Sequence, residues 1–189
     1  MSDDDRFKLA ADRFGLAHRE DPKGEAATYH ETLASWVDRL DPNASEPLRL
    51  AARCQHLRRH ETPRSAFPEG PVGYKRWRSE AARKHAADAA TVLREVGYGD
   101  DVIGRVGDLL VKKGFRSDPE GQLLEDAVCL TFLELELERF ADKYSDDKVV
   151  DILKKTWVKM SARGHEAAVK LSRGLPLRLT SLIAKATGS

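Results

Sequence analysis

Apolar side chains recur every three or four positions along almost the whole chain, which is the spacing of one face of an α-helix. In the first such segment Phe7, Ala10, Phe14 and Ala17 fall on one face, after aspartates at 3–5 that can cap a helix. No segment alternates apolar and polar residues in the way a half-buried strand does. The pattern therefore predicts an all-α protein.

Turn and capping residues divide this pattern into nine predicted helices. We expect helices to end at Asp-Pro dipeptides, at Gly97 and at Gly114. We expect helices to begin at Ser45, Asp118 and Ser161. The predicted helices span about residues 3–20, 25–40, 45–61, 71–96, 100–113, 118–143, 145–160, 161–171 and 175–186. No repeat or long linker interrupts them, so we expect a single helical domain over residues 1–189.

Composition narrows the class of protein. The chain is 33% charged and 41% hydrophobic with a net charge of +1, so no overall charge attracts it to nucleic acid or membranes. Cys54 and Cys129 form no CxxC pair and lie in helical patterns, where a reduced thiol packs as a small apolar side chain. The acidic start and the absence of a long apolar run predict a cytoplasmic protein without a membrane segment.

The charge is unevenly distributed along the chain. Residues 49–84 hold ten Lys and Arg against three Glu, a balance of +7, and residues 120–151 hold ten acids against three bases, a balance of −7. Either the two stretches complement each other within the fold, or the basic stretch lines an anion site.

Three potential metal ligands lie beside apolar stripes on three separate predicted helices: His56, His85 and Asp126. Ionisable groups in such places are unfavourable unless they are paired, hydrogen-bonded or metal-bound. His85 is therefore either a ligand or a core histidine bonded to a carboxylate or a backbone carbonyl. Asp126 is either a ligand or the partner of an arginine from the basic stretch.

Other histidines add to this set. His56 and His60 have the i, i+4 spacing with which one helix presents two imidazoles to a metal, and His30 and Glu31 are further candidates. Two histidines and a carboxylate from different helices suit one divalent ion such as Zn, Mn or Fe. We expect His165 to have a structural role and His18 to be exposed at a helix end.

The segment that carries His56 and His85 is also rich in cations. Arg64, Arg78 and Lys84 are placed to hold phosphate oxygens if the histidines form a site. Tyr74 and Trp77 lie between them and could stack on a base, or they pack at a rim. The sequence has no glycine-rich phosphate loop, serine-nucleophile elbow or HExxH motif.

The arrangement resembles the histidine–aspartate (HD) phosphohydrolase superfamily, an all-helical fold with a His, a His-Asp pair and a later Asp on successive helices. Gln55-His56 stands at the place of the pair, while His85 and Asp126 resemble the later ligands. Without an adjacent His-Asp pair, the sequence departs from a standard two-metal centre.

A closer likeness covers almost the whole chain. The segments at 51–56, 62–65, 73–78, 124–126 and 155–161 look like the family known as domain of unknown function 4202. This resemblance implies that one site is formed by Glu31, Gln55, His56, Arg64, Tyr74, Trp77, Arg78, His85, Glu125 and Asp126.

Together these observations favour a metal-dependent hydrolase of a phosphomonoester, a nucleotide or a phosphorylated RNA end. One divalent metal would be held by His56, His85 and Asp126, with Glu31 as a possible fourth ligand, and would activate water. Glu125 or Gln55 would orient that water. The alternative is a catalytically degenerate domain that binds a nucleotide, RNA or a protein partner through the basic stretch.

Overall fold

The computed structural model describes residues 2–188, and within them it contains ten α-helices and no strand. The all-α prediction is confirmed. The helices are α1 (Asp3–Arg19), α2 (Ala26–Leu40), α3 (Glu46–Cys54), α4 (Gly70–Val96), α5 (Asp100–Leu110), α6 (Pro119–Thr131), α7 (Leu137–Lys143), α8 (Asp146–Trp157), α9 (Ala162–Ser172) and α10 (Leu177–Thr187).

Local sequence explains most helix boundaries. Ser45 and Ser161 accept hydrogen bonds from the backbone N–H groups of Leu48 and Gly164, so both are side-chain N-caps. Gly97 ends α4 in the left-handed conformation, with φ of 91°. The first helix is capped by Ser2, one residue before the aspartates expected to cap it.

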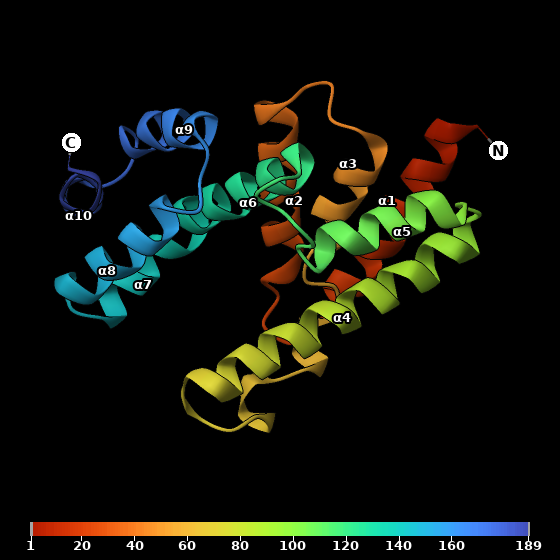
Figure 1. Ribbon diagram of the computed structural model, residues 1–189, viewed down its shortest axis with the longest axis horizontal. Helices are drawn as coiled ribbons and strands as arrows, with labels where there is room; N and C mark the ends of the chain where they lie inside the picture. The colour runs from red at the N-terminus through yellow and green to blue at the C-terminus, as the bar shows by residue number, and fades with distance from the viewer. Residues whose placement is uncertain (1, 189) are drawn as a thin grey trace.

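The helices are arranged around α2, α3 and α6 (Figure 1). The long α4 packs antiparallel to α5 along one side, and α1 contacts α2, α3 and α4. The C-terminal helices α8, α9 and α10 gather at the other end, so the two chain ends lie far apart. The core runs through both groups and includes Phe14, Leu50, Leu93, Leu130 and Leu182, which are essentially fully buried.

Three predicted helices end differently from expectation. The third stops at Cys54 instead of continuing to residue 61, because the backbone N–H of His56 donates to His30 Nε2 and Arg58 takes a left-handed conformation with φ of 51°. The fifth stops at Leu110, before Lys112, whose φ is 59°. The sixth divides into α6 and α7 around a π-helical turn, η3 (Phe132–Glu136).

No helix within residues 2–188 combines the length and the apolar character needed to cross a membrane.

Candidate functional site

Three aromatic rings from three segments meet at the centre of the molecule. His56, in the turn after α3, lies with its ring centroid 5.8 Å from that of His85 on α4 and 5.3 Å from that of Tyr29 on α2. The Nδ1–H of His85 donates to the backbone carbonyl of Leu57, 2.6 Å away. His85 is therefore hydrogen-bonded to a backbone carbonyl, which is one of the two interpretations of its sequence position. Its Nε2 remains available to another partner.

Two further histidines lie directly behind this group. His30 Nδ1 donates to the Ala26 carbonyl at 2.7 Å, so its Nε2 is the acceptor for the backbone N–H of His56 at 3.1 Å. His18 stacks on His30 with ring centroids 3.7 Å apart. His18 is only 4% exposed, so the expectation of an exposed histidine was wrong. These contacts fix the position of His56.

A buried carboxylate held by two lysines completes the arrangement. Glu125 on α6 is 4% exposed and forms an ion pair with Lys112. Lys159, in the turn after α8, places its Nζ 3.8 Å from Glu125 Oε1. Two positive charges therefore face one negative charge, which leaves a local excess of positive charge.

Arg59 adds a third cation. Its guanidinium lies 5.0 Å from the centroid of the Trp77 ring, and no carboxylate of the described chain lies within 4 Å of it.

Burial and the charge of Arg59 hold the pKa of His56 well below its ordinary value. Burial also lowers the pKa of His85, to about 4. Both imidazoles are therefore neutral at pH 7. We name the set formed by Tyr29, His56, Arg59, His85, Lys112, Glu125 and Lys159 the central cluster.

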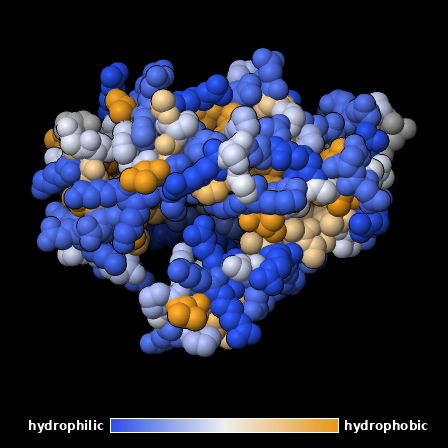
Figure 2. All heavy atoms as spheres, in the orientation of Figure 1, coloured by the Kyte–Doolittle hydropathy of each residue, from blue (hydrophilic) through white to orange (hydrophobic). Residues whose placement is uncertain are grey.

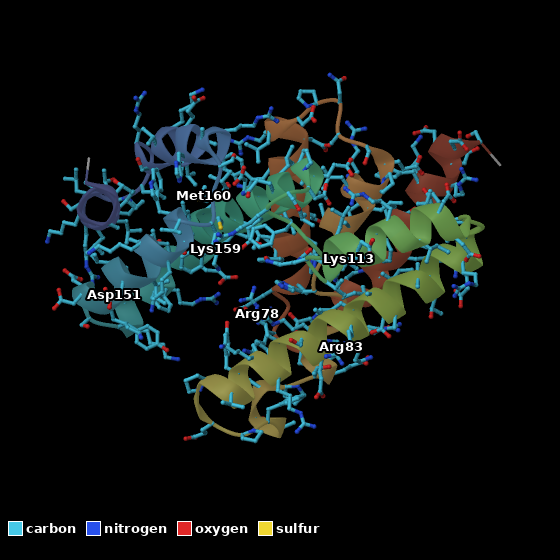
Figure 3. All side chains as sticks on the ribbon, in the orientation of Figure 1. Arg78, Arg83, Lys113, Asp151, Lys159 and Met160 are labelled. Carbon is cyan, nitrogen blue, oxygen red and sulfur yellow. The ribbon has the colours of Figure 1, made fainter. Side chains whose placement is uncertain are left out.

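The surface is hollowed in the same part of the molecule. Figure 2 shows a depression near the centre of the view, surrounded mainly by hydrophilic residues, and Figure 1 has α6 above it and α4 below it. Figure 3 places Lys159 on the upper side of this depression and Arg78 of α4 on its lower side, whereas Arg83 lies farther along α4. Charged side chains thus approach the depression from separate elements.

The structure does not bring Asp126 to the histidines as a free ligand. Its Oδ1 accepts the backbone N–H of Ser161 at 2.8 Å and the Gln122 amide at 3.1 Å, and its Oδ2 accepts the Ser161 hydroxyl. Within residues 2–188, no arginine or histidine nitrogen lies within 4 Å of its carboxylate. Asp126 instead anchors the start of α9 to α6.

Two other predicted site residues, Glu31 and Gln55, differ in their surroundings. Glu31 is exposed and lines a different pocket, beside His18 and on the other side of α2 from Tyr29. Gln55 is 3% exposed, and its Oε1 has no hydrogen-bond partner. His60 lies in the short turn η1 (Arg59–Glu61), so it does not share a helix with His56.

The structure brings the predicted metal ligands together only in part. No group of three or more His, Cys, Asp or Glu residues within 2–188 is arranged to hold a metal ion. Only His56 and His85 of the predicted ligands lie together, and Arg59 and Lys112 place positive charge beside them. Two of the four predicted ligands are therefore adjacent, and the binding of a divalent ion stays a prediction.

The predicted phosphate-binding residues are only partly available. Arg78 is exposed and has no carboxylate within 4 Å in the part of the chain that the structure describes. Lys84 is paired with Glu61 at 2.8 Å and Asp88 at 3.0 Å. Arg64, in η2 (Arg64–Ala66), donates to the Phe67 carbonyl at 2.9 Å.

The two aromatic residues predicted to stack on a base, Trp77 and Tyr74, differ in their exposure to solvent. Trp77 is 8% exposed and its indole N–H donates to the Thr62 carbonyl, so it packs rather than presenting a face to a base. Tyr74 is 46% exposed, and its ring centroid lies 5.7 Å from that of Trp77. Only Tyr74 offers a free aromatic surface.

The basic and acidic stretches do not neutralise each other through ion pairs. Within residues 2–188, no salt bridge joins residues 49–84 to residues 120–151, and Arg59 and Glu136 interact only at longer range. The two stretches therefore do not complement each other through ion pairs, and an anion site lined by the basic stretch stays a prediction.

Sequence reasoning missed Tyr29, Lys112 and Lys159. Lys112 and Lys159 lie in turns after helices, where helical periodicity carries no information about direction. Tyr29 neighbours His30, which was a candidate, but nothing local shows which of two adjacent helical side chains faces the site.

His165 is structural, as expected. Its ring stacks on Trp157 with centroids 3.8 Å apart, and its Nε2–H donates to the Trp157 carbonyl.

The fold and the site define a class: an all-α domain whose histidines and cations converge beside a surface depression. The chain belongs to the family Domain of unknown function (DUF4202), whose model matches residues 8–183. No match to this chain was found among the curated proteins or among the solved structures.

Proposed function

We propose that this protein binds a small phosphate-bearing ligand, of the nucleotide class, at the central cluster. The observation that carries the proposal is the convergence of Lys112 and Lys159 on the Glu125 carboxylate, with the charge of Arg59 acting on the neighbouring His56. A phosphate group offers several strong acceptor oxygens and negative charge, which such a group of cations stabilises. Arg59 supports this role because no carboxylate of residues 2–188 lies within 4 Å of its guanidinium.

One of the neutral histidines suits an anion. Each neutral imidazole has a single N–H, and that of His85 is donated to the Leu57 carbonyl, which leaves the N–H of His56 to donate to a bound anion. The half-exposed Tyr74 on α4 supplies an aromatic face for a base. These features favour a nucleotide over inorganic phosphate as the preferred ligand.

The proposal is tested with two arginines of α4. Arg78 lies at the depression, while Arg83 is also exposed and lies farther along the same helix. Inorganic phosphate, pyrophosphate and ADP are titrated by calorimetry into wild type, Arg78→Ala, Arg59→Ala and the control Arg83→Ala. Loss of a charge-assisted hydrogen bond should weaken binding by about tenfold or more in the first two variants only.

Two results would contradict this function. One is the absence of heat from all three ligands with wild-type protein at low salt. The other is an equal loss of affinity in Arg83→Ala, which would indicate a diffuse electrostatic effect. Circular dichroism of each variant separates loss of binding from loss of the helical fold.

Metal-dependent hydrolysis of a phosphomonoester is the second candidate. It is favoured by one observation, the pair of imidazoles with ring centroids 5.8 Å apart and lowered pKa values, since the neutral imidazole is the form of histidine that binds a metal. Wild type and His85→Ala are compared in a screen of phosphomonoesters and nucleotides with added Mn²⁺, Zn²⁺ or Fe²⁺. Turnover that disappears in His85→Ala would favour the enzyme, and equal background in both would favour the binding domain.

A further inference from the structure

A second pocket lies behind the histidines and is not part of the central cluster. It has a volume of about 270 Å³ and opens between α1 and α2, with Arg53 of α3 also lining it. Small residues make the space, because Ala11, Gly15, Ala27 and Ala34 have little or no side chain to fill it. A pocket just below the size range of drug-binding sites suits a ligand of a few heavy atoms.

One buried atom of this pocket lacks a partner. The Nε2–H of His18 donates to the Arg53 carbonyl at 2.7 Å, so the neutral ring carries its lone pair on Nδ1. His18 is 4% exposed and lines the pocket, and its Nδ1 is buried without a hydrogen bond. A buried acceptor without a donor is unfavourable by about 1–3 kcal/mol, and a ligand that donates a hydrogen bond removes this penalty.

Charges of both signs surround the same space. Asp12, Arg19, Glu31 and Arg53 line the pocket, and none of them has an opposite charge within 4 Å in the part of the chain described. Arg53 is half-buried, and its guanidinium is held by the Arg49 carbonyl and the Phe7 ring rather than by a carboxylate. A purely anionic ligand would meet two carboxylates here, and a purely cationic ligand would meet two guanidinium groups.

We propose that this pocket binds a small zwitterion of the α-amino acid class. The ammonium group donates to His18 Nδ1 and is balanced by Glu31 and Asp12, and the carboxylate accepts from Arg53 and Arg19. A metal ion is a poorer occupant, because these residues form no three-ligand group within 2–188. The proposal is independent of a phosphate ligand, since the central cluster lies on the far side of His30.

The experiment uses a variant that fills the pocket and keeps all of its charged residues. Gly15 lies on α1, and a Cβ added there meets only Arg19 Nη1, at 3.8 Å, so Gly15→Leu should occupy the space and keep the helix. The control is Gly104→Leu on α5, where an added Cβ has nothing within 4 Å. Glycine, L-alanine and L-serine are added at about 20 mM, so that binding with a dissociation constant of about 1 mM is detected.

The readout is the ¹⁵N chemical shift of His18, measured by long-range ¹H–¹⁵N correlation. A bound ammonium should shift Nδ1 upfield by hydrogen bonding in wild type and Gly104→Leu, with no shift in Gly15→Leu. Acetate and methylammonium, the two halves of the ligand, should each bind at least tenfold more weakly than the amino acids. The proposal is overturned if none of the three amino acids shifts His18 in wild type, if Gly15→Leu responds equally, or if either half binds as well as the whole.

Discussion

Lys112 forms an ion pair with the buried carboxylate of Glu125, and it does so from a left-handed backbone conformation with φ of 59°. A lysine rarely adopts this conformation, which is unfavourable by about 1–3 kcal/mol unless surrounding structure enforces it. Arg58, at φ of 51°, is the other non-glycine residue in residues 2–188 with positive φ. Arg58 directly precedes Arg59, so both unusual backbone positions adjoin the central cluster.

Removing the Lys112 ammonium should destabilise the fold. Lys112→Met leaves the Glu125 carboxylate buried with only Lys159, at 3.8 Å, as a partner. We expect a loss of about 3 kcal/mol in the free energy of unfolding, the lower end of the range for an unpaired buried charge. Urea denaturation of the variant measures this loss.

The neighbouring Lys113 provides the control for that variant. Its side chain is 71% exposed and pairs with Asp108, so Lys113→Met should change the free energy of unfolding by less than about 0.5 kcal/mol. The double variant Lys112→Met with Glu125→Gln should recover part of the loss. Equal stability of Lys112→Met and Lys113→Met would show that the ion pair is energetically unimportant.

Asp126 should prove to be a structural residue. Asp126→Ala removes the acceptor of the Ser161 N–H and hydroxyl, and we expect a loss of about 2–4 kcal/mol, since bonds to a charged acceptor are each worth about 1.5–3 kcal/mol. Phosphate-ligand affinity should stay within about threefold of wild type if enough folded protein is present. If Asp126→Ala is stably folded but no longer binds the ligand, Asp126 takes part in ligand binding.

Two glycines should respond in opposite directions to the same substitution. A Cβ at Gly164 would come within 2.7 Å of the Asp126 carboxyl group, which is buried and hydrogen-bonded, so Gly164→Ala should be destabilised by at least about 1 kcal/mol. At Gly104, in an exposed part of α5, the same Cβ meets nothing within 4 Å, and Gly104→Ala should gain about 0.4–1 kcal/mol. Thermal unfolding of the pair checks this, and a stabilised Gly164→Ala would contradict the tight contact between α6 and α9.

The free energy of unfolding should fall as the pH drops below about 6.5. The pKa of buried His85 is about 4 in the folded protein, against about 6.5 in an unfolded chain, so protons bind the unfolded state first. The contribution of His85 is fully present above pH 6.5 and is lost between pH 6.5 and about 4, by about 3 kcal/mol.

The His85 contribution is isolated with His85→Asn. Urea denaturation between pH 7 and pH 4.5 should show about one proton fewer taken up on unfolding of the variant at pH 5 than of wild type. The same proton uptake in both proteins would indicate that His85 titrates normally in the folded state.

The sequence could predict the helices because their signals are local. Apolar spacing identifies the faces that become the core, and Ser45, Ser161 and Gly97 mark boundaries through hydrogen bonds or φ values within a few residues. The same patterns identified His85 as a buried histidine, because its helix face is otherwise apolar. Its partner, the Leu57 carbonyl, lies 28 residues away and was not identifiable from the helix itself.

The tertiary structure decided which polar residues meet. His30 Nε2 accepts the His56 backbone N–H across 26 residues, and this contact ends α3 early and removes the helical i, i+4 relation between His56 and His60. Asp126 and Glu31 were sound candidates by residue type, yet the packing of α6 against α9 and the rotation of α2 direct them elsewhere. Helical periodicity gives the face on which a residue lies, but a site depends on how several faces are placed against one another, and long-range packing alone fixes that placement.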